Sequence, residues 1–284
     1  MRARVPASTS NIGPGFDVLG LALSLYTEVE IAPADALSIT ATGDGAALSA
    51  DPDHLAARVV RAVLGHDRVE ITIRSEIPIG RGLGSSAALA LAAAAAAGAP
   101  DPLAVAAAFD GHGENAAASA RGGLVAARMI DGAVVARPLA LDDRIGIVAI
   151  VPDRELRTAN ARSVLPQTVP FADAVFNLGG LGLLIAGLAD VDGLVAAAGA
   201  DRLHQDARTT LFPEAPALLE ALRAAGAVIS CWSGAGPTLL GLCRSAAAAA
   251  STAEACGGAL ARFGLTGRVL TLEPDRTGLV ITGS

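Results

Sequence analysis

The chain of 284 residues contains no lysine, since all 21 basic residues are arginines. This absence excludes a Walker A phosphate loop, which needs a lysine before its Ser or Thr. It also excludes Schiff-base and pyridoxal-lysine chemistry. Any phosphate that the protein binds must therefore be held by backbone amides, hydroxyl groups, arginine and a metal ion.

Aromatic residues and cysteines are also scarce. Only 3% of the residues are aromatic although 52% are hydrophobic, so we expect tight packing of helices on sheets rather than aromatic clusters. Cys231, Cys243 and Cys256 are odd in number and have no histidine at metal-ligand spacing. They are therefore expected to be reduced, packed thiols, without a disulfide or a zinc site.

Neither a signal peptide nor a basic excess is present in the sequence. The N-terminus lacks the basic, apolar and small-residue order of a signal peptide, and the apolar run at 89–97 is about half the length that a bilayer requires. The net charge of −7 argues against nucleic acid or an acidic membrane surface as a partner. The composition therefore predicts a cytoplasmic protein that acts on a small molecule.

A glycine- and serine-rich segment, 78–88, lies between a strand-like alternation at 69–74 and an alanine-rich helix pattern that ends near residue 97. Its glycines allow the backbone to bend and approach a ligand, and its two serines are favoured N-cap types. Because a helix N-terminus attracts anions, we expect a phosphate-binding loop here; the alternative is a turn with only a structural role. The residues expected at the nucleotide are Pro78, Ile79, Gly80, Arg81, Gly82, Leu83, Gly84, Ser85 and Ser86.

The remaining patterns predict an α+β protein of two domains, 1–141 and 142–284. We expect strands at 2–5, 21–31, 69–74, 145–151, 227–231, 239–243 and 269–272, a hairpin within 124–136, and a structured loop at 6–20. Helices are expected at 52–64 with Asp51 as its cap, in two pieces within 100–120, and from residue 172.

Three motifs, at 6–20, 78–88 and 233–238, occur in the order found in homoserine kinases of the galacto-, homoserine, mevalonate and phosphomevalonate (GHMP) kinase superfamily. The chain resembles these proteins from about residue 4 to about residue 245. The resemblance implies an ATP-binding first domain of the ribosomal-protein-S5-domain-2-like type and a ferredoxin-like second domain, with the active site in the cleft between them. It also implies a homodimer.

The same resemblance assigns the amino-acid pocket. Asn11 and Asp17 would line it, with Asp17 at the substrate ammonium, and two arginines in further family motifs, Arg162 and Arg208, would clamp the carboxylate. A guanidinium suits that role because its planar donors meet both oxygens. Without the family, Asn11 and Asp17 would be turn formers and each arginine a solvated charge.

The segment 110–118 matches the family pattern Glu-Gly-His-x-Asp-Asn-Val-Ala-Pro with changes. Asp110 stands in place of the glutamate that binds magnesium together with Ser86, Glu114 in place of the aspartate, and Ala118 in place of the proline. Because Asp110 is one methylene shorter, it must draw the helix inward or bind Mg²⁺ through water. The alternative for Asp110 is an ordinary carboxylate at a helix end.

Two more residues receive roles from the family pattern. His112 and Asn115 would orient the substrate hydroxyl, and His54 stands where the family has an asparagine on the adenine side of the nucleotide. The alternative for His54 is a surface histidine. Asn115 and Glu114 are the catalytic candidates; we expect positioning by Asn115 to matter more than a base, because a loose transition state places little demand on the nucleophile.

The resemblance therefore implies transfer of the γ-phosphate of ATP to the hydroxyl of L-homoserine with Mg²⁺, giving O-phospho-L-homoserine for threonine biosynthesis. One alternative is a kinase of the superfamily for mevalonate, a sugar or shikimate, which would have no use for Asp17 beside two arginines. The other is a catalytically weakened, ligand-binding member, suggested by the changes at residues 110 and 114.

Overall fold

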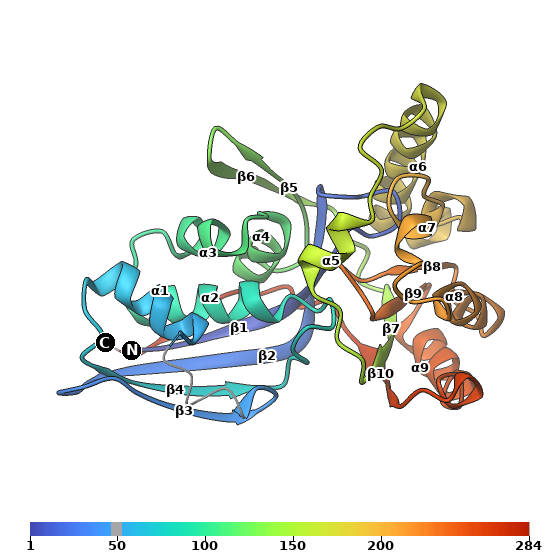
Figure 1. Cartoon of the computed structure of the whole chain (residues 1–284). Coiled ribbons are helices and arrows are strands. Elements are labelled where there is room, and N and C mark those ends of the chain that lie inside the picture. The colour runs from blue at the N-terminus through green and yellow to red at the C-terminus, as the bar shows by residue number, and fades with distance from the viewer. Residues whose placement is uncertain (47–52, 284) are drawn as a thin grey trace.

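A computed structural model describes residues 1–46 and 53–283. Two lobes, each built from a sheet with helices packed on it, lie side by side (Figure 1). In the first lobe a seven-stranded sheet has the order β11-β1-β2-β4-β3, with the hairpin β5–β6 joined to β2. The second lobe has an antiparallel four-stranded sheet of order β10-β7-β9-β8. The predicted α+β, two-lobed architecture is confirmed.

The first sheet is covered on one face by helices α1 to α4 (Figure 1). Its strands are β1 (Arg2–Ser10), β2 (Leu19–Pro33), β3 (Ser38–Gly43), β4 (Val69–Ser75), β5 (Leu124–Ile130), β6 (Ala133–Leu139) and β11 (Val280–Thr282). The helices are α1 (Leu55–Leu64), α2 (Ser85–Ala96), α3 (Pro102–Asp110) and α4 (Glu114–Arg121). Asp51 lies outside the described residues, and the N-cap of α1 is His54.

Helix α2 lies at the centre of this layer, between the sheet and the neighbouring helices. Almost every residue from Ala87 to Ala96 is buried, and the helix packs against β1, β2, α1, α3 and α4. Alanine has the highest helix propensity, and its small side chain lets a helix approach a sheet closely. The alanine-rich sequence thereby fixes the N-terminus of α2 at the cleft between the lobes.

The N-terminal segment differs from the prediction. The strand expected at 2–5 continues to Ser10, with a shift in register between Pro6 and Ala7. A bulge of this kind accommodates a proline, which cannot donate to the sheet. The loop therefore begins only at Asn11, and two of its non-glycine residues, Asn11 (φ 59°) and Asp17 (φ 54°), adopt the left-handed conformation.

The second lobe carries helices α8 and α9 on its sheet, while α6 and α7 lie above this sheet in the view of Figure 1 and α5 lies toward the first lobe. Its strands are β7 (Gly146–Pro152), β8 (Ile229–Trp232), β9 (Leu239–Cys243) and β10 (Gly267–Leu272). Its α-helices are α5 (Thr158–Ser163), α6 (Phe171–Ala189), α7 (Gln205–Arg208), α8 (Ala215–Ala224) and α9 (Ala246–Ala255), and its short 3₁₀ turns are Val191–Gly193, Ala196–Gly199 and Ala261–Phe263. Strand β7 is buried over its whole length, as its continuous apolar run predicts.

The chain crosses between the lobes near residues 140–145 and returns near 273–279, where Pro274 pairs with Leu23. Strand β11 then pairs with β1, placing Thr282 opposite Arg2. The predicted second unit, 142–284, thus gives its last strand to the first sheet. The sequence did not predict β11, because three residues are too few to show an alternating pattern and their pairing partner, β1, lies at the other end of the chain.

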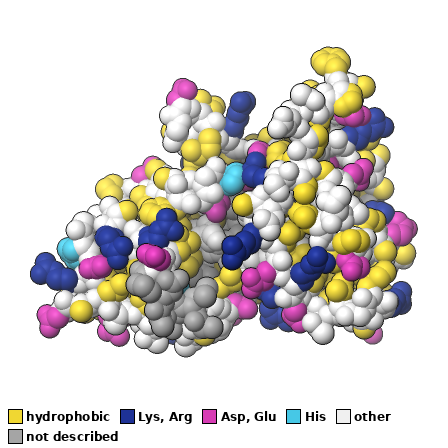
Figure 2. Space-filling view, viewed as in Figure 1, with side chains coloured by type: hydrophobic (Ala, Val, Ile, Leu, Met, Phe, Trp, Pro, Cys, Tyr) yellow, Lys and Arg dark blue, Asp and Glu magenta, His cyan; other side chains and the backbone are white. Residues whose placement is uncertain are grey.

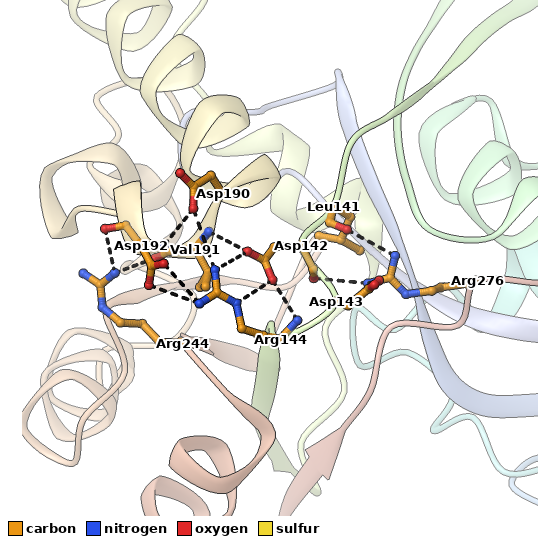
Figure 3. A network of polar contacts seen from close by, with 9 residues as sticks. All are labelled: Leu141, Asp142, Asp143, Arg144, Asp190, Val191, Asp192, Arg244 and Arg276. Atoms are coloured by element: carbon orange, nitrogen blue, oxygen red, sulfur yellow. Dashed lines mark hydrogen bonds and ion pairs between the residues drawn. The ribbon is translucent and has the colours of Figure 1, made fainter.

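The two crossings are tied together by arginines (Figure 3). Arg276, in the returning segment, donates to the carbonyls of Leu141 and Asp142 and pairs with Asp143 at 3.0 Å. Arg144 binds Asp142 and Asp192, and hydrogen bonds from the Arg144 guanidinium hold the pKa of Asp142 well below its usual range. Arg276 therefore joins the two crossings, and Arg144 joins the first crossing to the turn at Val191–Gly193.

Helix α6 is the one described helix that is long and apolar enough to cross a membrane by length and composition alone, with a mean hydropathy of 1.7. It is longer than the apolar run at 89–97 that the sequence analysis compared with a bilayer. The inner face of α6 packs against the rest of the protein. Asn177 donates a hydrogen bond to Asp201 at 2.7 Å, and Gly187 lies so close to Leu194 that an added Cβ would be 2.8 Å from it. Its outer face is apolar and exposed.

Candidate active site

Three loops meet where the lobes face each other. The hydroxyl of Ser233, after β8, lies 2.6 Å from the carbonyl oxygen of Gly82 and 2.9 Å from the hydroxyl of Thr9 on β1. The N–H of Gly234 donates to the carbonyl of Ser10 at 2.9 Å. The loop before α2, the end of β1 and the loop after β8 are thus joined by hydrogen bonds across the two lobes.

Two glycines of the 78–88 loop are required by close packing. Both adopt the left-handed conformation, with φ of 75° at Gly82 and 69° at Gly84. A Cβ on Gly82 would lie 2.2 Å from the carbonyl oxygen of Ser233, and one on Gly84 would lie 2.3 Å from the hydroxyl of Ser8. No side chain fits at either position, so the loop approaches both partners through its backbone.

The N-terminus of α2 opens onto this junction. Its N-cap is Gly84 rather than a serine, and no side chain caps it. The prediction that Ser85 or Ser86 caps the helix is wrong: both are its first helical residues, so their hydroxyls and N–H groups remain available to a ligand. With the helix dipole, these groups could hold a phosphate.

A cleft of about 350 Å³ begins at this helix end and runs between the lobes, and Figure 2 shows the surface hollowed there with histidine, arginine and acidic side chains nearby. The predicted residues that line it are Asn11, Gly80, Gly82, Gly84, Ser85, Ser86, Asp110, His112, Glu114, Asn115, Arg162 and Arg208. Lining residues that the sequence did not single out for a role are Ser10, Ala87, Leu156, Thr158, Ala159, Gly234 and Ala235. Long-range folding thus gathers most of the predicted set in one place.

A second cavity of about 160 Å³ adjoins the cleft and shares Ser85 and Ser86 with it. Its walls include Ile79, Leu55 and His54. His54 is buried, and its Nδ1 accepts a hydrogen bond from the N–H of Ala56 at 3.2 Å. The alternative of a surface histidine is therefore wrong, and a largely apolar chamber lies beside the phosphate site.

Three residues of the predicted nucleotide loop do not line either cavity. Pro78 and Leu83 are buried. The guanidinium of Arg81 donates to the carbonyls of Pro152 at 2.9 Å and Asp153 at 2.6 Å, at the end of β7. Arg81 therefore anchors the loop to the second lobe and does not direct its charge toward a phosphate.

The break between α3 and α4 places carboxylates opposite the phosphate loop. Burial raises the pKa of Asp110 to about 6, an effect that the nearby His112 opposes. Burial also raises the pKa of Glu114, and the charge of Asp17 adds to this effect. For both carboxylates the effect of burial outweighs the positive charge of Arg162, which acts to lower their pKa values.

The donor set fits a magnesium ion carried by a nucleotide. Asp110 and Ser86 line the same cleft, and the described residues contain no cluster of three His, Cys, Asp or Glu side chains that could hold a metal ion. Mg²⁺ usually takes one or two protein ligands and completes its shell with phosphates and water. Ser86 and Asp110 match that habit.

The side chain of Asn115 is held at both ends. Its Oδ1 accepts from the hydroxyl of Ser8 at 3.1 Å, and its Nδ2 donates to the hydroxyl of Ser10 at 3.1 Å. Ser119, one turn further along α4, donates to Ser8 at 3.0 Å. The orientation of Asn115 is therefore fixed by β1.

The far end of the cleft holds two arginines and one carboxylate around an aromatic ring. Arg162 pairs with Asp17 through two contacts, of 2.5 and 3.1 Å. Both Arg162 and Arg208 lie over the ring of Phe16, 5.4 and 5.6 Å from its centroid, and His204 stacks on it at 5.1 Å. Neither Phe16 nor His204 was expected in the site.

Arg208 is a buried cation, 1% exposed. Its Nη1 donates to the carbonyl of Gly234 at 2.7 Å and to Nδ1 of His204 at 3.1 Å, while Nε2 of His204 lies 2.8 Å from the carbonyl of Gly13. Burial lowers the pKa of His204 to about 4, so this histidine is neutral and orients the arginine.

Arg208 forms no ion pair with a carboxylate among the described residues, although the charges of Asp17 and Asp201 act on it. Its Nε is buried without a hydrogen-bond partner, and burial, with the charge of Arg162 adding to it, lowers its pKa to about 10. A buried donor without a partner is costly. An anionic ligand at this end of the cleft removes that cost.

A phosphate site and a charged recognition site in one cleft between two α+β lobes define a small-molecule phosphotransferase. Residues 54–123 match the family model described as GHMP kinases N terminal domain, and residues 184–261 match the one described as GHMP kinases C terminal. The chain belongs to the GHMP kinase family.

Similar proteins span almost the whole chain. A homoserine kinase of Streptomyces coelicolor is 40% identical over 300 residues, covering 98% of this chain and 96% of that protein, and one of Moorella thermoacetica is 36% identical over 98% of both. The crystal structure of homoserine kinase from Cytophaga hutchinsonii superposes with a TM-score of 0.85 at 25% identity, covering 99% and 97%. The L. major mevalonate kinase, at 18% identity and a TM-score of 0.75 with 96% of each chain covered, shares the fold.

Gly82→Ala should lower both the midpoint of thermal unfolding and the affinity for nucleotide, because its Cβ would collide with the Ser233 loop. Gly65→Ala is the matched control: Gly65 has a φ of 72° and nothing within 4 Å of an added Cβ. The control should lose only the cost of the left-handed conformation, about 1–2 kcal/mol, and keep its KM for ATP. Equal losses in both variants would show that the loop contact is unimportant.

Asp110→Asn should change how activity depends on pH and magnesium. Since burial raises the pKa of Asp110 to about 6, the charged form that binds metal is lost as the pH falls through 6, so kcat/KM for MgATP should fall there in the natural protein. The variant should lack this limb and need more magnesium at pH 8. Superimposable pH and magnesium profiles would remove Asp110 from the metal site.

Proposed function

We propose that the protein is an ATP-dependent homoserine kinase that produces O-phospho-L-homoserine in the cytoplasm. The observation that carries the substrate is the cluster at the far end of the cleft, where the unmatched cation of Arg208 lies beside the paired charges of Asp17 and Arg162. Two cations and one anion complement the carboxylate and ammonium of an α-amino acid. The homoserine kinases that are up to 40% identical support the same assignment.

The nucleotide occupies the other end. The N-terminus of α2 receives its phosphates at Ser85 and Ser86, and the adjoining cavity with Ile79 and His54 receives the base. The γ-phosphate then points along the cleft toward the amino-acid cluster. Loop residues without room for a Cβ bring backbone N–H groups close to the phosphates.

Magnesium is held by Ser86 and Asp110 together with the phosphates. When bound, it neutralises the charge that develops on the phosphate oxygens. Asp110 is then ionised, because a nearby cation favours the charged carboxylate.

Asn115 and His112 orient the substrate hydroxyl toward the γ-phosphate, with Glu114 beside them. The rigid hold of Ser8 and Ser10 on Asn115 suits positioning. Phosphoryl transfer through a loose transition state depends mainly on alignment and charge stabilisation, so a general base contributes little here.

The direct test is a screen of acceptors with ATP and magnesium, in which ADP release and the mass of the product are measured. L-Homoserine should be phosphorylated far faster than mevalonate, galactose or shikimate. Faster transfer to one of those acceptors would assign another specificity within the family. Tight binding of homoserine and ATP without transfer would instead identify a ligand-binding member.

Arg162→Ala and Arg208→Ala should each raise the KM for homoserine, because each removes a charged hydrogen bond to the carboxylate. A loss of about 2 kcal/mol corresponds to roughly thirtyfold in KM. Arg128, exposed on β5, provides the control: Arg128→Ala should leave KM unchanged, and all three variants should keep their KM for ATP. An unchanged KM for homoserine in both cleft variants would refute the clamp.

Glu114→Gln should lower kcat by less than about tenfold, because positioning rather than base catalysis dominates. Asn115→Ala should lower it more, because the hydroxyl loses its orientation. Single-turnover rates at saturating substrates separate the two. A drop of about a thousandfold in Glu114→Gln with KM and folding intact would identify Glu114 as a general base.

The outer face of α6 supports a homodimer. Phe171 (84%), Val175 (50%), Leu178 (69%) and Leu183 (54%) are exposed, and no charged residue lies between Asp173 and Asp190. An apolar face of this size is typical of an interface.

A second copy of the chain, packed antiparallel through a two-fold axis, fits this face best. Arg202, 51% exposed, lies over Phe176 and pairs with Asp173 at 3.1 Å near the beginning of α6, and Asp190, 72% exposed, lies at its end, 3.8 Å from Arg144. An antiparallel pair brings each arginine toward the opposite copy's aspartate and opposes the two helix dipoles. Gly179 and Gly182, on the exposed face near the middle, let the two helices approach closely.

Leu178→Asp should convert the dimer to a monomer, because each interface would bury two uncompensated carboxylates. Ile130→Asp, at a site 46% exposed on β5, is the control and should remain dimeric. Sedimentation velocity measures both, with vesicle flotation to test for a membrane instead. A natural protein that sediments as a monomer, or that floats with vesicles, would refute the self-association of α6.

A further inference from the structure

The ion pair between Asp17 and Arg162 joins the two lobes at the edge of the cleft. Asp17 belongs to the loop between β1 and β2, in the first lobe, while Arg162 lies on α5 in the second. The two guanidinium nitrogens face the two carboxylate oxygens, at 2.5 and 3.1 Å. About a third of each side chain is exposed to solvent, 33% for Arg162 and 39% for Asp17. Arg162 lines the cleft, and Asp17 reaches it through this ion pair.

The two partners differ in freedom. The backbone of Asp17 is fixed in the left-handed conformation, and its N–H donates to Oδ1 of Asn11 at 2.8 Å. The Nδ2 of Asn11 is in turn bound to the carbonyl of Gly234. Arg162 lies on the six-residue helix α5, and an arginine side chain has several rotatable bonds. When the pair opens, the arginine therefore moves and the carboxylate stays.

Arg208, by contrast, has no ion pair to a carboxylate within the described residues, and its buried Nε has no partner. It lies near Arg162, whose positive charge lowers its pKa further. The cluster without ligand thus holds one matched cation and one unmatched cation.

We propose that an amino acid binds by exchange with the Asp17–Arg162 ion pair, so that its two charges are recognised cooperatively. This inference rests on the proposed function. The ligand carboxylate binds Arg208 and draws Arg162 to itself, and the ligand ammonium takes the place of Arg162 at Asp17. Afterwards every charge in the cluster has a partner.

A ligand with only one charge cannot complete this exchange. A carboxylate alone binds Arg208, but Arg162 stays with Asp17. An ammonium alone displaces Arg162 from Asp17 and leaves it unpaired beside Arg208, where like charges repel. The contribution of the ammonium therefore depends on the carboxylate, and the ion pair excludes neutral alcohols and simple amines from the site.

The exchange predicts that one substitution, Asp17→Asn, raises the affinity for one ligand and lowers the affinity for another. Asp17→Asn keeps the shape, and asparagine tolerates the left-handed conformation, so the fold is preserved. Removing the carboxylate releases Arg162 to a bound anion. Butanoate, which has no ammonium, should bind the variant about threefold or more tightly than the natural protein, whereas 2-aminobutanoate should bind about tenfold or more weakly.

Isothermal titration calorimetry of these two ligands, which lack the reacting hydroxyl, tests the proposal on the whole protein. Glu155→Gln is the matched control: it removes the same charge from a 65% exposed side chain beside Gly80 and leaves the ion pair in place. Butanoate affinity should change little in the control. The KM for ATP in each variant verifies folding.

Weaker or unchanged butanoate binding in Asp17→Asn overturns the exchange, and so does an equal gain in Glu155→Gln, which would reduce the effect to net charge. Phosphoryl transfer to homoserine, measured in parallel on the natural protein, separates the two claims. If homoserine is phosphorylated but the two charges of the ligand contribute independently to affinity, only the exchange is refuted. If the affinities for butanoate and 2-aminobutanoate change in opposite directions but no phosphoryl transfer occurs, the exchange stands and the kinase activity is refuted.

Discussion

The contact between the Ser233 hydroxyl and the Gly82 carbonyl is the interaction on which the rest of the site depends. It joins the loop that begins α2, in the first lobe, to the loop that follows β8, in the second. Gly234, the next residue, accepts from Arg208 and from Asn11. One short stretch of backbone therefore fixes the phosphate end of the cleft relative to the amino-acid end, which is what transfer between two bound substrates requires.

Three ionisable groups of the cleft have shifted pKa values. The half-buried Asp110 and the buried Glu114 have raised pKa values and lie opposite the phosphate loop, and a buried arginine with a lowered pKa, Arg208, lies at the other end. In each of these groups the effect of burial outweighs that of the opposite charges nearby. A cation such as magnesium on the acidic side and an anion on the basic side would favour the charged forms of these groups.

Much of the fold follows from patterns that act locally. The alternation at 69–74, the alanine run of α2 and the Asp131–Gly132 turn between β5 and β6 predicted their elements closely. The failures involve long-range pairing or backbone geometry. The parallel partner of β4, strand β3, and the last strand, β11, were missed because their partners lie elsewhere in the chain, and the N-cap of α2 was misplaced because only packing against Ser8 requires a glycine there.

The site shows the same division. Most predicted residues line one cleft, because motif spacing identifies residues that a fold brings together. Spacing could not show which donors are already engaged. Arg81 donates a hydrogen bond to the backbone at the end of β7, His204 accepts one from Arg208, and Asp17 is paired with Arg162. These partnerships depend on side-chain directions across the lobes, which a sequence does not display.

The most direct test of this account is a crystal structure of the protein with L-homoserine and a non-hydrolysable ATP analogue. The account predicts the substrate carboxylate on Arg208 and Arg162, its ammonium on Asp17, its hydroxyl facing the γ-phosphate at the N-terminus of α2, and no remaining contact between Asp17 and Arg162. An amino acid bound elsewhere, with the Asp17–Arg162 pair intact, would contradict it.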